Sequence, residues 1–168
     1  EILEKETEYK APAVSYYSHI AYTDKNYQTA LEGFQTISCE SMFKSIAPYY
    51  ITQIYYKQEK YKKVIEYAPV YMDSVSSKRK SEFAKLIGDS YYYEKKYSDA
   101  IPYLMEFRNG VKATRVDNYQ IGFAYYGTKN YENAVKYLGR ASTKKDALSQ
   151  TAYYHMAESY LKLEEKDY

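Results

Sequence analysis

The residues that could carry catalytic or metal-binding chemistry are few and scattered along the chain. The two histidines, His19 and His155, have no cysteine, histidine or carboxylate at a recurring metal-ligand spacing. Cys39 is the only cysteine, so an intrachain disulfide is impossible. Its place late in an expected helix favours a buried, apolar role over a nucleophilic one. No glycine-rich phosphate loop occurs. We therefore expect no enzyme activity, no cofactor and no metal.

Tyrosine is the side chain that the sequence uses most unusually. The chain has 26 tyrosines and no tryptophan among 168 residues. A tyrosine buries a large ring but keeps a hydroxyl that needs water or a hydrogen-bond partner. Such a composition indicates many half-buried positions, which thin, two-layer helical arrays provide. The chemistry it favours is recognition, because tyrosine offers a large contact area at a small cost in conformational entropy.

Charge and hydropathy exclude two classes of partner. The net charge of +2 and the pI of about 8.4 are below what a nucleic-acid-binding domain usually shows. The densest basic run, residues 78–80, fits a solvated turn. No apolar run approaches the roughly 18 residues that a membrane span needs. We expect no nucleic acid partner and no membrane span, and the composition leaves the cellular compartment open.

A polar turn that ends in tyrosine organises the whole chain. It returns five times, with the marker tyrosines spaced by 34, 36, 34 and 37 residues. A period in this range is typical of stacked helical repeats. The chain stops where the second helix of a repeat would begin, so we expect a fragment of a longer protein. The marker tyrosines are Tyr27, Tyr61, Tyr97, Tyr131 and Tyr168.

Apolar residues at three- and four-residue spacing predict one helix before each marker and one after it. The expected first helices carry Val14, Tyr17, Ile20 and Ala21; Ile51, Ile54 and Tyr55; Ala84, Ile87, Gly88 and Tyr91; Ile121, Gly122 and Tyr125; and Tyr153, Met156, Ala157 and Tyr160. The expected second helices carry Ala30, Leu31, Phe34 and Ile37; Val64, Ile65, Ala68 and Tyr71; Ala100, Ile101, Leu104 and Phe107; and Ala134, Val135, Leu138 and Ala141.

Prolines, glycine and serine predict where some of these helices begin and end. Pro69 falls inside a second helix and predicts a kink or an early end. The serine-rich segment Asp73–Ser81 predicts a flexible loop. Ser98 is a plausible N-cap, which would place Pro102 at the edge of a first turn. Gly110 is expected to close a helix in the left-handed conformation.

In sequence, the repeating unit resembles the tetratricopeptide repeat. With the marker tyrosine counted as position 17, that family has small residues at positions 8 and 20, tyrosine at 11 and a large apolar residue at 24. The usual glycine of position 15 is replaced here by lysine or glutamate. The third repeat fits this frame with Gly88, Tyr91, Tyr97, Ala100, Leu104 and Phe107, and the fourth with Gly122, Tyr125, Tyr131, Ala134, Leu138 and Ala141.

The resemblance implies an all-α fold, a right-handed α-solenoid of antiparallel helix pairs. The whole chain, residues 1–168, would form one array. Ile2 and Leu3 would belong to the end of an upstream helix. The tyrosine- and lysine-rich style is similar to that of bacterial envelope proteins with long arrays of this family. The expected complete repeats are 11–44, 45–80, 81–114 and 115–149, with partial repeats at 1–10 and 150–168.

In this family the first helices line a groove that binds protein partners, and the resemblance implies which side chains face it. The function expected is a scaffold that captures a protein or an extended peptide. The Asn/Lys/Arg clamp of chaperone-binding members is absent here. The expected groove residues are Tyr22, Tyr56, Tyr92 and Tyr126 at position 12; Tyr49, Tyr119 and Tyr154 at position 5; His19, Gln53, Asp89, Phe123 and Glu158 at position 9; and the nearby Lys57 and Lys85.

Two alternatives stay open at this stage. The tyrosines at position 12 could simply pack between neighbouring first helices, without contacting a ligand. The segment could also be a structural spacer or an oligomerisation module, self-associating while another part of a multidomain protein carries the activity.

Overall fold

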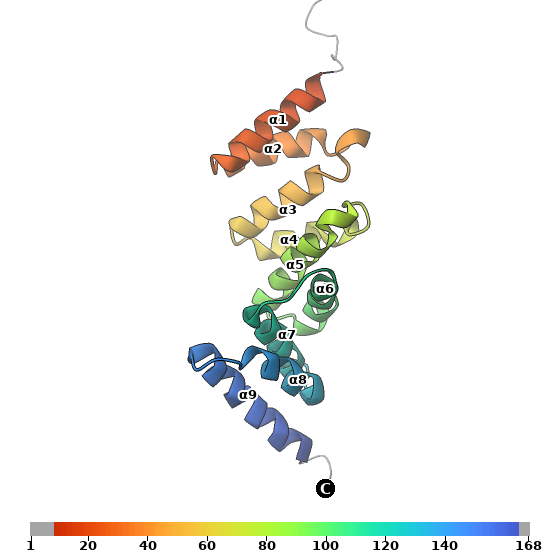
Figure 1. The fold of residues 1–168 in the computed structure, drawn as a ribbon. Helices are drawn as coiled ribbons and strands as arrows, with labels where there is room; N and C mark the ends of the chain where they lie inside the picture. The colour runs from red at the N-terminus through yellow and green to blue at the C-terminus, as the bar shows by residue number, and fades with distance from the viewer. Residues whose placement is uncertain (1–8, 165–168) are drawn as a thin grey trace, which may run out of the picture. The chain divides into compact units, whose positions relative to one another are not determined.

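The computed structural model describes residues 9–164, and every regular element in that range is helical. Ile2, Leu3 and Tyr168 lie outside it. Each remaining marker tyrosine is the first residue of a second helix, so the predicted register is confirmed (Figure 1). The α-helices are α1 (Lys10–Thr23), α2 (Tyr27–Ile37), α3 (Ala47–Lys57), α4 (Tyr61–Tyr67), α5 (Ser77–Tyr93), α6 (Tyr97–Gly110), α7 (Arg115–Gly127), α8 (Tyr131–Ala141) and α9 (Ala147–Glu164). Short 3-10 helices span Ser41–Phe43 and Pro69–Tyr71.

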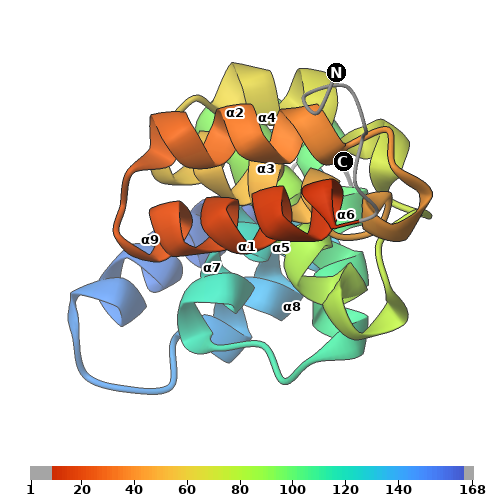
Figure 2. The ribbon, with the colours of Figure 1, turned by 90° about the horizontal axis from the view of Figure 1, so that it is seen from above.

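The chain forms two compact halves, one ending at Arg79 and the other starting at Lys80. In the N-terminal half α1 packs on α2, α2 on α3, and α3 on α4. Figures 1 and 2 both show α1 and α2 side by side as one hairpin. In the C-terminal half α6 packs on α7, α7 on α8, and α8 on α9, while α7 also contacts α9. Each half is therefore a stack of helical hairpins in which successive first helices meet.

The turn inside each repeat has the same backbone geometry. The residue two positions before the marker tyrosine has a left-handed φ of 61°, 56°, 59° and 61° in the four repeats. The next amide donates to a carbonyl five residues back, as in the hydrogen bond of 2.9 Å from Lys96 N to Tyr91 O. This pattern is a Schellman motif, in which glycine is the usual left-handed residue. The residues that adopt this conformation here are Lys25, Glu59, Lys95 and Lys129.

Small residues at two positions let the helices of a repeat approach closely. The residue at position 20 is fully buried in each of the four complete repeats. It is an alanine in three of them and Val64 in the second. At position 8, a Cβ added to Gly88 would lie 2.9 Å from the Leu104 side chain, and one added to Gly122 would lie 2.8 Å from the Leu138 side chain. The close packing of α5 on α6 and of α7 on α8 therefore depends on the absence of side-chain atoms at these two glycines.

The structure tests four of the predicted helix boundaries. The α-helix before Pro69 ends at Tyr67, so the early end is confirmed. The N-cap of α6 is Lys96, not Ser98, and this places Pro102 inside the helix. Gly110 ends α6 without a left-handed φ. Helix α5 starts at Ser77, so the loop before it is shorter than the expected segment 73–81.

Several residues predicted to be buried are exposed. In α1, Tyr17 is 71% exposed and Ile20 is 38% exposed, because the helix packs through Ser18 and Ala21 instead. In α9, Tyr153 and Tyr160 are more than half exposed, since Ser149, Ala152 and Ser159 face the neighbouring helices. Cys39 is exposed, because α2 has already ended at Ile37. Ala157 is exposed for the same reason as Tyr153.

None of the helices described is both long and apolar enough to cross a membrane.

Candidate functional site

Three of the tyrosines at position 12, Tyr22, Tyr92 and Tyr126, contact the first helix of the following repeat. The Tyr22 hydroxyl donates to Gln53 Oε1, from α1 to α3. The Tyr126 hydroxyl donates to Glu158 Oε2 at 2.9 Å, from α7 to α9. In each pair a position-12 tyrosine meets the position-9 residue of the following repeat. We call the side of the first helices that carries positions 5, 9 and 12 the first-helix face.

An aromatic contact takes the place of this hydrogen bond where position 9 is a phenylalanine. The centroids of the Tyr92 and Phe123 rings are 6.1 Å apart, in an edge-to-face arrangement. Burial raises the pKa of the Tyr22 hydroxyl to about 12 and also raises that of Tyr92 well above its usual value. Both hydroxyls therefore remain protonated at neutral pH, and that of Tyr22 acts as a donor.

Each position-12 ring also packs against the marker tyrosine five residues later. The ring centroids are 6.1, 5.6, 5.6 and 6.2 Å apart in the four repeats, at interplanar angles of 56° to 68°. Edge-to-face pairs of this kind contribute about 0.5–1.5 kcal/mol beyond their buried area. The pairs are Tyr22–Tyr27, Tyr56–Tyr61, Tyr92–Tyr97 and Tyr126–Tyr131.

In the C-terminal half the first-helix face carries a cluster of rings around His155. The His155 ring centroid lies 4.9 Å from those of Phe123 and Tyr126 and 5.2 Å from that of Tyr154. Tyr119 stacks on Phe123 at 6.0 Å. We call these five side chains the ring cluster. Helix α7 contributes three of them and α9 two, so the contact between these first helices assembles it.

Glu158 is the carboxylate of the ring cluster. It accepts hydrogen bonds from the hydroxyls of Tyr126 and Tyr154, and its Oε2 lies 3.2 Å from His155 Nδ1. Desolvation alone would raise the pKa of Glu158, but these hydrogen bonds outweigh it and lower the pKa. Glu158 is therefore an anion at neutral pH. Its side chain is 34% exposed, and Tyr154 is 61% exposed, so solvent reaches both.

Lys85 and Asp89, both expected to face a ligand, belong to an internal ion-pair network. The Lys85 ammonium donates to Asp117 Oδ1 and lies 3.6 Å from Asp89 Oδ2. Both aspartates are buried. Asp117 also accepts hydrogen bonds of 2.7 Å from the backbone amide and from the hydroxyl of Thr114, in a capping box at the start of α7. Burial acts to raise the pKa of Asp117, but hydrogen bonds from Lys85 and Thr114 lower it.

The expected groove residues of the N-terminal half lie in different environments. Tyr49 is only 6% exposed, and the Arg79 guanidinium lies 4.9 Å from its ring centroid. Gln53 is half-buried and accepts the Tyr22 hydroxyl. His19 is exposed beside Tyr50, with ring centroids 5.3 Å apart. Lys57 is exposed at the end of α3, and Tyr56 is half-buried.

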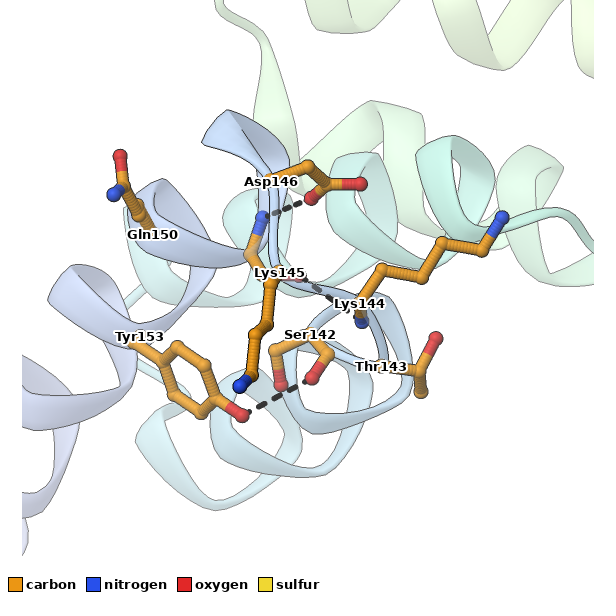
Figure 3. A pocket seen from close by; sticks show the side chains of 8 residues that line it. Ser142, Thr143, Lys144, Lys145, Asp146, Gln150 and Tyr153 are labelled. Atoms are coloured by element: carbon orange, nitrogen blue, oxygen red, sulfur yellow. Dashed lines mark hydrogen bonds between the residues drawn. The ribbon is translucent and has the colours of Figure 1, made fainter.

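A cavity of about 690 Å³ lies beside the loop between α8 and α9 (Figure 3). Its only lining carboxylate is Asp146, which holds Arg115 through two hydrogen bonds of 2.7 and 2.9 Å. Asp146 also accepts the Ser149 amide at the start of α9. The Arg115 hydrogen bonds lower the pKa of Asp146 well below its usual value. The Tyr153 hydroxyl closes one side by donating to Ser142 O. The loop is therefore held by its own polar groups.

Sequence reasoning missed Arg115, Asp117, Asp146, His155 as the centre of the cluster, and the stacking of Arg79 on Tyr49. Two of these carried a signal. Thr114 and Asp117 are three residues apart, as in a capping box. Asp146 stands three residues before Ser149, where an N-cap side chain accepts a backbone hydrogen bond. Four members of the ring cluster, Tyr119, Phe123, Tyr126 and Tyr154, were among the expected groove residues. Their contacts around His155 carried no signal, because α7 and α9 are a full repeat apart in the chain.

Residues 9–164 bring no group of three or more histidine, cysteine, aspartate or glutamate side chains together as a metal site would. The arrangement on the first-helix face instead combines aromatic surface, hydroxyl donors and one carboxylate. It can provide apolar contact, hydrogen bonds and attraction for a positive charge.

Comparison with known proteins supports the fold. No family model and no curated protein sequence matches the chain. Among solved structures, MamA of AMB-1 superposes with a TM-score of 0.73 at 14% identity, covering 94% of this chain and 84% of that one. A MamA double mutant of RS-1 superposes with a TM-score of 0.68 at 15% identity, and the match covers 94% of this chain and 97% of that one.

A putative kinesin light chain of Podospora anserina, described as having nearly identical TPR-like repeats, is also similar. Its TM-score is 0.58 at 10% identity, and the match covers 96% of this chain and 90% of that one. At these identities the likeness concerns the fold. The chain therefore has an all-α, tetratricopeptide-like solenoid fold built from helix pairs.

Proposed function

We propose that this chain is a scaffold that captures an extended segment of a partner protein along its first-helix face. The observation that carries this proposal is the ring cluster. Five aromatic side chains from two successive first helices lie within 6.4 Å of a neighbour, centroid to centroid, and one of them is largely exposed. Aromatic anchors dominate binding energy at protein interfaces.

The rings are held in place before a partner arrives. Tyr126 is fixed by Tyr131 on one side and by Glu158 on the other. Phe123 is fixed by Tyr92, Tyr119 and His155. Binding to side chains that are already ordered costs little further conformational entropy. The same contacts that stack the repeats would thus prepare the face for binding.

The internal contacts narrow the set of residues that we propose to touch the partner. Lys85, Asp89, Gln53 and Tyr49 hold helices together through ion pairs, a hydrogen bond and burial. We propose that they position the face without contacting the partner. The proposed contact residues are Tyr119, Phe123, Tyr126 and Tyr154 in the C-terminal half, and His19, Tyr22, Tyr56 and Lys57 in the N-terminal half; Tyr92 supports Phe123.

We also propose that the chain has no catalytic activity of its own. Within residues 9–164 the carboxylates with lowered pKa values are Asp117, Asp146 and Glu158. Each is held by hydrogen bonds that stabilise its charge, so none is suited to accept a proton as a general base near neutral pH.

Selection of peptides from a random display library tests the proposal. Peptides should be enriched on the immobilised chain and should bind the Tyr154→Ser variant several-fold more weakly. The matched control is Tyr160→Ser, which removes an exposed tyrosine from another part of α9 and should bind as the wild type does. A library that yields no enriched peptide, or peptides that bind both variants equally, contradicts the proposal.

Self-association is a second candidate function, and the exposed faces of α1 and α9 favour it. Tyr16 and Tyr17 in α1 are each 71% exposed, and Tyr153 and Leu161 in α9 are 55% and 60% exposed. Contiguous exposed apolar surface often marks an interaction site. Sedimentation velocity over a hundredfold range of concentration decides between the two functions. A monomer throughout eliminates the oligomerisation module.

A further inference from the structure

We infer that the ring cluster and Glu158 together recognise a cationic side chain, lysine or arginine, of the segment that the scaffold captures. This inference rests on the proposed function and gives the chemical class of the partner. The partner would present its positive charge to the aromatic faces beside Tyr154 and to the Glu158 carboxylate.

The spacing of the rings suits a cation. Aromatic faces attract a lysine or arginine head group within about 6 Å of the ring centroid. Phe123, Tyr126 and Tyr154 surround the His155 ring at 4.9–5.2 Å. A head group above this cluster would therefore lie within reach of more than one ring. Tyr154 is the ring most open to an incoming side chain, at 61% exposure.

The charge of Glu158 adds a second attraction. Two of its hydrogen-bond donors are tyrosine hydroxyls, which are neutral and leave the carboxylate charge in place. The lowered pKa keeps this charge at neutral pH, and 34% of the side chain remains exposed. A carboxylate that is partly desolvated among rings attracts a cation more strongly than one in bulk water.

Two cations of the same half are bonded to other carboxylates. Lys85 is bonded to Asp117, and Arg115 is bonded through both terminal nitrogens to Asp146. The negative charge of Glu158 is complementary to a basic segment. An acidic segment would be repelled by Glu158, and a purely apolar one would bury that negative charge without adding a cation to balance it.

Peptides from the display selection provide the test. Enriched peptides should share at least one lysine or arginine, and its replacement by glutamine should weaken binding to the wild type about five- to tenfold. On the Glu158→Gln variant the same peptide replacement should weaken binding by a clearly smaller factor, because only the attraction of the rings then remains. This double-mutant cycle isolates the interaction between the peptide cation and Glu158.

Matched controls separate this interaction from general charge effects and from misfolding. Glu106→Gln removes one exposed negative charge from α6, and here the peptide replacement should keep its full effect. Glu158→Gln keeps the side-chain shape, and an unchanged circular dichroism spectrum verifies its fold. Tyr154→Ser provides a second variant at an exposed position.

The outcomes distinguish the inference from the function on which it rests. Enriched peptides without any basic residue, or a basic residue whose replacement matters equally on Glu158→Gln, overturn the inference but leave peptide capture intact. The absence of any enriched peptide overturns both.

Discussion

The Tyr126 hydroxyl donates to Glu158 Oε2 at 2.9 Å, joining the last turn of α7 to the middle of α9. The N-terminal half contains the same relationship between Tyr22 and Gln53. In these two pairs the tyrosine at position 12 thus joins one repeat to the next. In the C-terminal half it also fixes a carboxylate beside a group of aromatic rings, so packing and recognition share one side chain.

Removing the Tyr126 hydroxyl should destabilise the chain modestly. Tyr126→Phe keeps the ring contact with Tyr131 but takes a donor from Glu158. We expect a loss of about 1 kcal/mol in the free energy of unfolding, the usual value of one hydrogen bond. Urea denaturation measures it, with Tyr160→Phe as the control at an exposed ring. Equal stability of the two variants would show that the bond does not hold the helices.

Glycine at the left-handed turn position should stabilise the array. Lys95 and Lys129 have φ values of 59° and 61°, a conformation that costs an ordinary residue about 1 kcal/mol. We expect Lys95→Gly and Lys129→Gly each to raise the melting temperature. The control is Lys136→Gly, inside α8, which should lower stability by about 1 kcal/mol. A lower melting temperature for all three variants would contradict the role of the turn geometry.

Alanine should have opposite effects at two kinds of glycine. At Gly122 an added Cβ would lie 2.8 Å from both the side chain and the backbone nitrogen of Leu138. We expect Gly122→Ala to cost about 1–3 kcal/mol through overpacking. At Gly139 the nearest atom would be 3.8 Å away, so Gly139→Ala should stabilise α8 by about 0.5–1 kcal/mol. Thermal unfolding compares the variants, and equal shifts of the same sign would refute the close approach of α7 and α8.

The Lys85 network should make stability depend on acid pH. Because the pKa of Asp117 is lower in the folded chain than its ordinary 3.8, its stabilising contribution is complete well above pH 3.8. That contribution is lost as the pH falls through the lowered value.

The matched measurement is the free energy of unfolding between pH 7 and pH 2 for the wild type and for Asp117→Asn. The variant should show a shallower decline below about pH 5, since it lacks the titrating group. Lys85→Met, which leaves two buried carboxylates without their cation, should cost about 1–3 kcal/mol at pH 7. If the free energy of unfolding fell in parallel with pH for the wild type and Asp117→Asn, the proposed role of the Lys85 ion-pair network would be contradicted.

The repeat period made most of the fold predictable from sequence. Each marker from Tyr27 to Tyr131 begins a helix, and the small residues of position 20 are buried as expected. These features are local or recur in register, so the sequence displays them. The start of α5 at Ser77 and the N-cap of α6 at Lys96 were missed by a few residues. Lys96 makes no side-chain capping hydrogen bond, so it carries no signal in the sequence.

The partners of individual side chains were less predictable. Tyr17 and Tyr153 fit an apolar helical stripe, yet both are exposed, because only tertiary packing decides which side of α1 and α9 is covered. Lys85 and Asp89 share a helix face at four-residue spacing, but the second carboxylate that Lys85 contacts, Asp117, comes from the next repeat. The contacts of the ring cluster likewise depend on how α7 and α9 are rotated about their axes.

An NMR titration with an enriched basic peptide tests the central claim most directly. The account predicts the largest chemical-shift changes at the aromatic resonances of Tyr154, Phe123 and His155, with small changes on α6 and α8. Shift changes confined to the second helices, with the ring cluster unaffected, would contradict capture along the first-helix face.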